Sequence, residues 1–263
     1  IDYSILDQHS ESYRKIRNTF RYLLGNLNDS FQEINLENLD IKKLPELEQF
    51  MLFKIYNLNK SFEKYFKNYD FHNLYKELLN FCTVDLSAFY FDIRKDTLYC
   101  DSKDSEKRKN TLMLLNVILN SLLRWFAPIL SFTTEEIYQL ISKHKNSIHL
   151  EEFLIFPKKF ENLELNEKWT QLLKIRDVCN LSIEEKRANK EIGSSLEATL
   201  KIKLNKKDFK IIEGIDLAEL CITSSVEIQN NNEEGIVVYA SKAKGNKCPV
   251  CWKINLDKCP RHG

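Results

Sequence analysis

The sequence has few of the residues that make tight turns, with six glycines and five prolines among 263 residues. This scarcity argues against an all-β fold, which needs many turns, and favours long helices. The chain also lacks an excess of either charge, because 39 lysines and arginines balance 38 acidic residues. Any attraction for a polyanion must therefore come from the local distribution of charge. With 43% hydrophobic residues, the chain can still build a sizeable core.

Long hydrophobic runs are also missing. The longest uncharged stretch of interest, residues 111–123, includes two asparagines and is too short to cross a bilayer of roughly 30 Å. Near Ile1 there is no charged leader followed by an apolar stretch, so no export signal is expected. Seven cysteines are an odd number, and four of them are scattered among apolar neighbours, which argues against a complete disulfide framework. We therefore expect a cytoplasmic protein that makes no use of a membrane.

From about residue 10 to residue 190, apolar residues recur mostly with the spacing of helices. The first such helix has an apolar arc that runs from Tyr13 to Leu27, and Ser10 is available as its N-cap. Further helices are predicted over residues 45–62, 71–96, 105–126, 133–141 and 166–190. Five or six helices with short connections predict a helical bundle.

The pattern changes at Gly193, after which residues 198–204 alternate with period two. A short helix and two more strands are predicted within residues 217–243. The predicted fold class is therefore mainly α, a helical bundle followed by a small α/β domain and a cysteine-rich end. The corresponding domain boundaries are 1–190, 191–245 and 246–263.

The last segment carries two closely spaced pairs of metal-binding residue types: Cys248 with Cys251, and Cys259 with His262. Zinc is held tetrahedrally by thiolate and imidazole, and a gap of two residues lets one tight turn present both ligands of a pair. Two pairs fill the coordination sphere, which indicates one structural Zn²⁺ rather than a catalytic ion with an open position. A redox pair or free thiols in a disordered tail are the alternatives, but a redox pair would leave the second pair without a role.

The same segment is locally basic and contains one candidate for base stacking, Trp252. Residues 242–263 contain a single acid, Asp257, and six basic residues: Lys242, Lys244, Lys247, Lys253, Lys258 and Arg261. An indole among lysines suits stacking on an unpaired base, with Lys253 as its neighbour. Alternatively, Trp252 packs against the metal-binding turns as their small core.

Basic residues also form a line on the predicted first helix, which we call the arginine stripe: Arg14, Arg17 and Arg21. With Asn18 beside them, their guanidinium groups can hold phosphates and read base edges. The alternative is a solvated face whose arginines pair with acids of a neighbouring helix, such as Glu46 or Glu48. Lys190, which follows Lys186 and Arg187 at the end of the last long helix, either supports an RNA backbone or belongs to a solvated run of charge.

Several blocks of the sequence together resemble one family. "SESYRKIRNTFRYLLGNLNDS", "LPELEQFMLFKIYNLNK", "NFCTVDLSAFYFDIRKDTLYCD", "APILSFTTEEIYQ", "KEIGSSLEA" and "CPVCW" are similar, in order and spacing, to the C-terminal region of bacterial isoleucyl-tRNA synthetases. The resemblance implies an anticodon-binding helical domain, a junction domain and a zinc-binding terminal domain of a monomeric class I synthetase that binds tRNA-Ile. The fourth zinc ligand of that family is commonly a cysteine, whereas His262 occupies the matching position here.

The resemblance also implies what this stretch of sequence does not contain. Neither a HIGH nor a KMSKS signature occurs, so no catalytic residue is expected here, and ATP and Mg²⁺ would be bound only by a catalytic domain outside this sequence. The role expected for this region in the reaction is to position tRNA for isoleucylation. The alternative is a zinc-finger DNA-binding protein of the DNA glycosylase type, which leaves the helical blocks unexplained. A helical scaffold that binds only protein is a third hypothesis.

Overall fold

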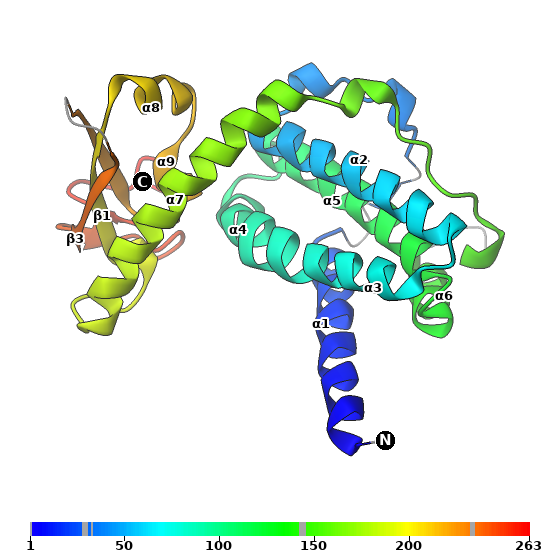
Figure 1. The fold of residues 1–263 in the computed structure, drawn as a ribbon. Coiled ribbons are helices and arrows are strands. Elements are labelled where there is room, and N and C mark those ends of the chain that lie inside the picture. Colours follow the sequence, from blue (N-terminus) through cyan, green and yellow to red (C-terminus); the bar gives the residue numbers. More distant parts are fainter. Residues whose placement is uncertain (1, 28–30, 33, 142–145, 232–234) are drawn as a thin grey trace. The chain divides into compact units, whose positions relative to one another are not determined.

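The computed structural model describes residues 2–27, 31–32, 34–141, 146–231 and 235–263 of the protein. They form two compact units, Ile1–Asn162 and Leu163–Gly263 (Figure 1). Among the helices within these described ranges, none is long and apolar enough to cross a membrane. Each unit is described below by itself.

The first unit is a helical bundle built around one buried helix. Its helices are α1 (Tyr3–Leu27), α2 (Glu46–Lys67), α3 (Phe71–Asn80), α4 (Phe91–Cys100), α5 (Glu106–Phe126) and α6 (Ser131–Ile141), with short 3₁₀ turns η2 (Leu36–Asn38), η3 (Ile41–Lys43), η5 (Ile148–Leu150) and η6 (Lys158–Phe160). Helix α5 begins where the Ser105 hydroxyl accepts a hydrogen bond from the Arg108 amide, and it packs against α1, α2, α4 and α6. Thirteen residues of α5 are buried, so the apolar stretch at residues 111–123 forms the centre of the core.

A continuous helical run, predicted over residues 71–96, extends over residues 71–100, and its middle third has wider turns. Between α3 and α4 the chain forms a π-helix, η4 (Phe81–Tyr90). Three consecutive aromatic side chains, Phe89, Tyr90 and Phe91, are buried across its end. In a regular α-helix these three would spread over about 200° of arc, so burial of all three requires core packing on more than one side. Helices α1 and α2 provide that packing through Tyr22, which stacks on Phe91, and Phe50, which contacts Phe89.

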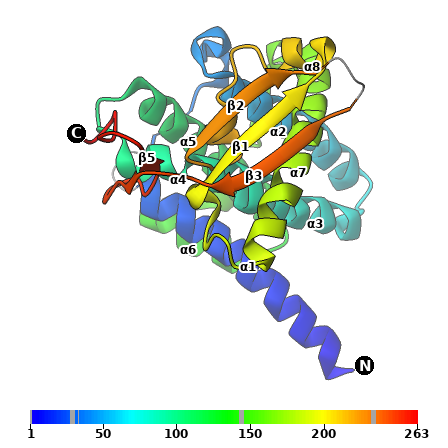
Figure 2. The same cartoon turned by 90° about the vertical axis from the view of Figure 1, so that its left-hand side faces the viewer.

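Helix α1 differs from the other helices of this unit because only its second half is packed. Its buried residues begin at Ile16 and recur through Thr19, Phe20, Leu23 and Leu27. The side chains of residues 2–11 are exposed, and this end of the helix extends beyond the other helices of the unit (Figures 1 and 2). The arginine stripe therefore lies at the transition from the free part of α1 to the packed part.

The second unit is a three-stranded sheet covered by a long helix. Its elements are α7 (Leu163–Ala188), η7 (Ser195–Glu197), β1 (Ala198–Leu204), α8 (Lys206–Ile211), α9 (Leu217–Leu220), β2 (Ser225–Asn230), β3 (Val237–Lys242), β4 (Asn246–Lys247) and β5 (Ile254–Asn255). Strand β1 lies in the centre, parallel to β2 and antiparallel to β3. The predicted class, a mainly α protein with a small α/β region, is confirmed.

Helix α7 packs on the sheet of its own unit. Sequence analysis grouped it with the bundle, because its 26 residues have the same apolar spacing as the earlier helices. Its buried residues, Trp169, Leu172, Ile175, Cys179 and Ile183, face β1 and β3. The Ser182 hydroxyl accepts a hydrogen bond from the Ala240 amide at 3.0 Å, which fixes the helix to β3. Periodicity identifies the helix but not the surface on which it packs.

Candidate metal centre and nucleic-acid interface

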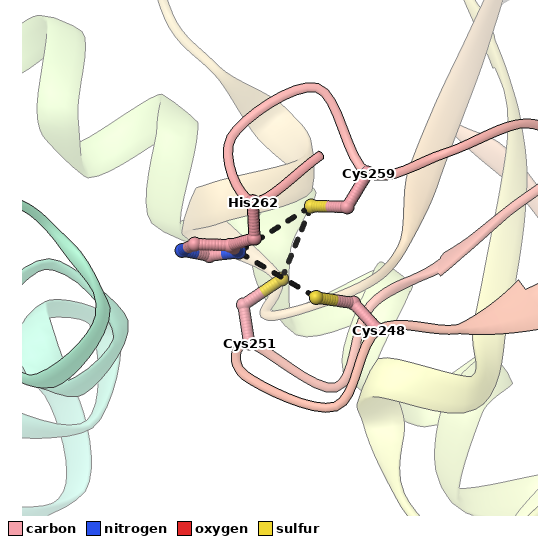
Figure 3. Close-up of side chains that lie close together, drawn as sticks. All are labelled: Cys248, Cys251, Cys259 and His262. Carbon is pink, nitrogen blue, oxygen red and sulfur yellow. Dashed lines mark hydrogen bonds between the residues drawn. The ribbon is translucent and has the colours of Figure 1, made fainter.

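Four potential metal ligands converge in the cysteine module, by which we mean residues 246–263. The ligand atoms of Cys248, Cys251, Cys259 and His262 all lie within 4.8 Å of one another (Figure 3). The Nδ1 atom of His262 lies 3.5 Å from Cys248 Sγ and 3.4 Å from Cys259 Sγ. The Sγ atoms of Cys251 and Cys259 are 3.8 Å apart. The structure thus brings together all four ligands that the spacing predicted.

The three distances of 3.4, 3.5 and 3.8 Å match edges of a coordination tetrahedron. Zinc–sulfur bonds of about 2.3 Å and zinc–nitrogen bonds of about 2.0–2.1 Å, at tetrahedral angles, separate two sulfurs by about 3.8 Å and a sulfur from a nitrogen by about 3.5 Å. Three soft sulfur donors and one borderline imidazole donor suit a borderline-soft metal ion. The arrangement could hold one ion with a complete set of protein ligands, which leaves no position for a substrate.

Local backbone geometry explains why the ligands converge. Strands β4 and β5 pair antiparallel, and the Cys248 amide donates to the Lys253 carbonyl at 2.9 Å across the turn between them. The second pair sits on a similar turn, where the His262 amide donates to the Cys259 carbonyl at 3.3 Å. Each turn presents its two side chains to the same point, as the two-residue gaps require.

The pKa values of the first two thiols, Cys248 and Cys251, are shifted in opposite directions. Hydrogen bonds from the backbone of Cys251 and then of Val250 lower the pKa of the Cys248 thiol to about 6. Burial raises the pKa of the Cys251 thiol to about 11. Because a metal binds the thiolate, Cys248 is prepared for coordination, whereas Cys251 needs the charge of the ion to lose its proton.

Trp252 follows the second ligand and is exposed. Its side chain is 59% accessible and its backbone adopts a positive φ of 63°, which holds the residue at the outside of the turn. The Lys247 ammonium lies 5.6 Å from the centre of the indole ring and 3.8 Å from a Glu197 carboxylate oxygen. The indole is thus presented to solvent with a cation beside it, rather than packed as the core of the module. Lys253 is half-buried in the same turn.

Sequence analysis missed the contacts that attach the cysteine module to the sheet. The Ser224 hydroxyl accepts a hydrogen bond from the Ile254 amide at 2.7 Å and donates one to the Leu196 carbonyl. Leu196 and Glu197 belong to the block "KEIGSSLEA", so this block holds the Ser224 hydroxyl that bonds to the module and provides the ion pair of Glu197 with Lys247. The block was visible in the sequence, but no local pattern connects it with a segment fifty residues further on.

The arginine stripe in the first unit is only partly free. Arg14 forms an ion pair with Glu11 at 2.6 Å on the same helix, and Arg17 lies 3.4 Å from Glu136 of α6. Arg17 also donates to the Tyr13 hydroxyl at 3.2 Å. For Arg21, no ion pair is found among the described residues. Neighbouring acids therefore do pair with the stripe, but they are Glu11 and Glu136 instead of the acids of α2.

Asn18 lies beside the stripe at a pocket of about 430 Å³ between α1 and the π-helix. Lys15 and Lys95 also line this pocket, together with the hydroxyl-bearing Thr83 and Ser87. The volume lies within the range of about 300–1,000 Å³ that is usual for ligand sites. Asn18, the predicted base reader, thus lines a concave surface of mixed polar and apolar character.

Lys190 lies just beyond α7 with a positive φ of 59° and an exposed side chain. The two basic residues before it are engaged locally, since Lys186 pairs with Glu191 at 3.0 Å and Arg187 pairs with Glu184 at 2.7 Å. These pairs support the interpretation of this run as a solvated charged surface around Lys190.

Comparison with known proteins defines the class. The family described as "Anticodon-binding domain of tRNA ligase" matches residues 48–204, which cover most of the helical unit, α7 and β1. The chain belongs to this family. It is also similar to isoleucine–tRNA ligases from three bacteria. The ligase of Pelagibacter ubique (strain HTCC1062) is 66% identical over 262 residues, which are 100% of this chain and 29% of the relative.

The other two relatives are more distant. The ligase of Bartonella quintana (strain Toulouse) is 37% identical over 264 residues, 96% of this chain and 27% of the relative. That of Brucella abortus (strain 2308) is 37% identical over 265 residues, 97% of this chain and 27% of the relative. The chain thus spans less than a third of the length of these curated relatives. These matches give no support to the DNA glycosylase hypothesis.

Proposed function

We propose that this chain is the tRNA-binding region of an isoleucyl-tRNA synthetase, and that tRNA-Ile is its partner. The observation that carries the proposal is the 66% identity to an isoleucine–tRNA ligase over the whole chain, together with membership of the anticodon-binding family. In this proposal residues 1–190 bind the anticodon arm, residues 191–245 form a junction, and residues 246–263 form a zinc-binding end. The protein works as a monomer in the cytoplasm.

The contribution of this region to the reaction is orientation. Isoleucine activation with ATP and Mg²⁺ takes place in a catalytic domain outside this sequence, and binding energy gained on the anticodon arm is used to bring the acceptor end of the tRNA to that domain. The arginine stripe holds phosphates, and Asn18 reads a base edge, because an amide offers a donor and an acceptor side by side. Trp252 and Lys253 contact the RNA from the cysteine module, and Lys190 supports its backbone.

The four ligands Cys248, Cys251, Cys259 and His262 hold one structural Zn²⁺ in this proposal. The tetrahedral separations and the Cys₃His donor set support zinc. Zinc orders a segment that has almost no hydrophobic core, since its binding free energy becomes folding free energy. Metal analysis of the purified chain should find one zinc ion. His262→Ala should lower zinc affinity, whereas His262→Cys should retain the ion because a thiolate is an equally competent ligand.

A direct binding measurement tests the proposed partner. The 263-residue chain is titrated into labelled transcripts of tRNA-Ile and of a tRNA with a different anticodon, at several salt concentrations. We expect tighter binding to tRNA-Ile and a linear fall of log affinity with log salt concentration. Equal affinity for both transcripts would contradict the proposal, and absence of RNA binding would favour a scaffold that binds only protein.

A further inference from the structure

One face of the sheet in the second unit is open. The side chains of β1 alternate between buried and half-buried, with Leu200 and Ile202 buried toward α7. On β3, Ala240 pairs with Leu200 and faces the same helix, where its amide bonds to Ser182. Tyr239 therefore points to the opposite side, because successive residues of a strand alternate between faces. Figure 2 shows the sheet from this side, with α7 behind it.

The open face carries an aromatic ring surrounded by lysines. Tyr239 is 57% exposed, and its partner across the sheet is Lys201 of the central strand. The Lys203 ammonium lies 5.8 Å from the centre of the tyrosine ring. Thr199 and Ser225, on the same face, share a 2.9 Å hydrogen bond between their hydroxyls.

Positive charge continues from this face along the chain. Residues 201–210, "KIKLNKKDFK", contain one acid and five lysines: Lys201, Lys203, Lys206, Lys207 and Lys210. The acid, Asp208, accepts a hydrogen bond from Asn205 at the start of α8. Among the described residues, the one ion pair of these lysines joins Lys201 to Glu227 at 3.7 Å, and both of those side chains are exposed. Such an exposed pair is weak and can exchange for a phosphate at little cost.

We infer that the open face of the sheet binds unpaired nucleotides of the RNA, with Tyr239 stacked on a base and Lys201 and Lys203 on the adjacent phosphates. An exposed aromatic on a sheet, flanked by cations, suits single-stranded RNA, because every base has a face that can stack while duplex bases are already stacked. A net charge of only +1 makes this local excess of lysines an electrostatic feature of the surface rather than of the whole chain. The inference rests on the proposed function, since it adds a second contact surface for the same RNA.

The test compares four versions of the full 263-residue chain: the unchanged protein, Tyr239→Ala, Tyr239→Phe and Lys203→Gln. Each is titrated into a tRNA-Ile transcript and into an RNA duplex without unpaired nucleotides. Tyr239→Ala should weaken transcript binding about five- to a hundredfold, whereas Tyr239→Phe should bind like the unchanged protein because phenylalanine also stacks. Lys203→Gln should reduce the slope of log affinity against log salt concentration by about 0.7. Duplex binding should respond little to either tyrosine substitution.

The outcomes separate this inference from the proposed function. If the unchanged protein fails to bind the transcript, the proposed function fails and this inference fails with it. If the unchanged protein binds but Tyr239→Ala binds equally well, the open face is no RNA surface, and the proposed function remains. Thermal unfolding shows whether Tyr239→Ala is still folded. If it is not, the transcript affinities of Tyr239→Leu and Lys203→Gln test the inference instead, because both variants keep a side chain suited to the sheet. If both variants bind the transcript as tightly as the unchanged protein does, the inference is overturned.

Discussion

Arg94 and Glu48 form an ion pair with two parallel hydrogen bonds inside the helical unit. Arg94 Nε donates to Glu48 Oε1 at 2.7 Å, and Arg94 Nη2 donates to Glu48 Oε2 at 2.6 Å. Both side chains are buried, with exposed fractions of 2% and 0%. The Tyr90 hydroxyl donates a third hydrogen bond to Glu48 at 3.0 Å. The pair therefore joins α2 to α4 with its hydrogen-bonding groups well satisfied.

Removal of one partner should destabilise the bundle strongly. Glu48→Ala leaves the Arg94 guanidinium buried without its counter-ion, which should cost about 3–5 kcal/mol of unfolding free energy. Urea unfolding measures this loss. Asp85→Ala is the control, because it breaks the partly exposed pair with Lys54 and should cost about 1 kcal/mol or less. A similar loss in both variants would show that burial does not determine how much an ion pair contributes to the free energy of unfolding.

Sequence alone could not assign this pair. Glu48 was a candidate partner for the arginine stripe, because acids and arginines on different helices can be matched in many ways. Only the packing of α2 against the run from residue 71 to residue 100 places Glu48 beside Arg94. The π-helix in that run could not be predicted from the sequence either, since apolar spacing over ten residues does not distinguish wide helical turns from regular ones. The helices themselves were predictable, because their apolar stripes and caps are local features.

Metal removal should disorder the cysteine module and leave the sheet folded. The module offers few apolar side chains to a core, so chelation of the ion or Cys251→Ala should abolish its ordered amide signals in NMR spectra. Signals of β1 and β3 should persist. Cys100→Ala, which removes a thiol outside the cluster, should retain the full metal content. A module that stays ordered without metal would contradict a structural role for the ion.

Gly245 should be essential to the same module for a steric reason. Its φ is +124°, and a Cβ atom there would lie 2.1 Å from the carbonyl oxygen of Asn255 in the paired strand. Gly245→Ala should therefore break the β4–β5 pairing and reduce the bound metal. Gly214→Ala is the matched control, because its φ of +79° causes backbone strain of about 1–2 kcal/mol with no atom within 4 Å of the new methyl group. Metal analysis and urea unfolding of both variants separate the clash from the strain.

Arg21 should contribute more to RNA binding than Arg14. Arg14 must give up its ion pair with Glu11 to reach a phosphate, while Arg21 has no competing ion pair among the described residues. Arg21→Ala should weaken tRNA binding about tenfold and reduce the salt slope by about 0.7–0.9, as expected for the loss of one phosphate contact. Lys109→Ala, which removes an exposed paired cation from α5, controls for net charge. Affinity unchanged in Arg21→Ala would exclude this part of α1 from the interface.

Trp252→Ala should weaken tRNA binding about five- to a hundredfold while zinc remains stoichiometric. The indole is exposed, so its removal creates no cavity in the module. Anisotropy titrations and metal analysis of the same preparation give both quantities. Zinc lost together with affinity would instead indicate that the ring packs against the metal-binding turns.

The candidate site was predictable to the extent that its chemistry is local. Cysteine and histidine spacing predicted the four side chains that converge in the module, because each pair sits on one turn. The orientation of Trp252 was left open by the sequence, because it depends on a positive φ and on Lys247 held by Glu197, fifty residues earlier in the chain. Likewise, the alternation of residues 198–204 predicted a strand but could not tell which face α7 would leave open.

The donor set of the cysteine module also determines how its metal affects its electrostatics. Six basic side chains and one acid give residues 242–263 a formal charge of +5. Three thiolates and a neutral imidazole around a divalent ion carry a net charge of −1, which is also the charge of the metal-free cluster with Cys248 as its thiolate, so the loaded module is no more positive than the metal-free one. Metal loading therefore cannot draw RNA to the module by adding positive charge. Any gain in affinity on loading must come from fixing Trp252 and the lysines in place.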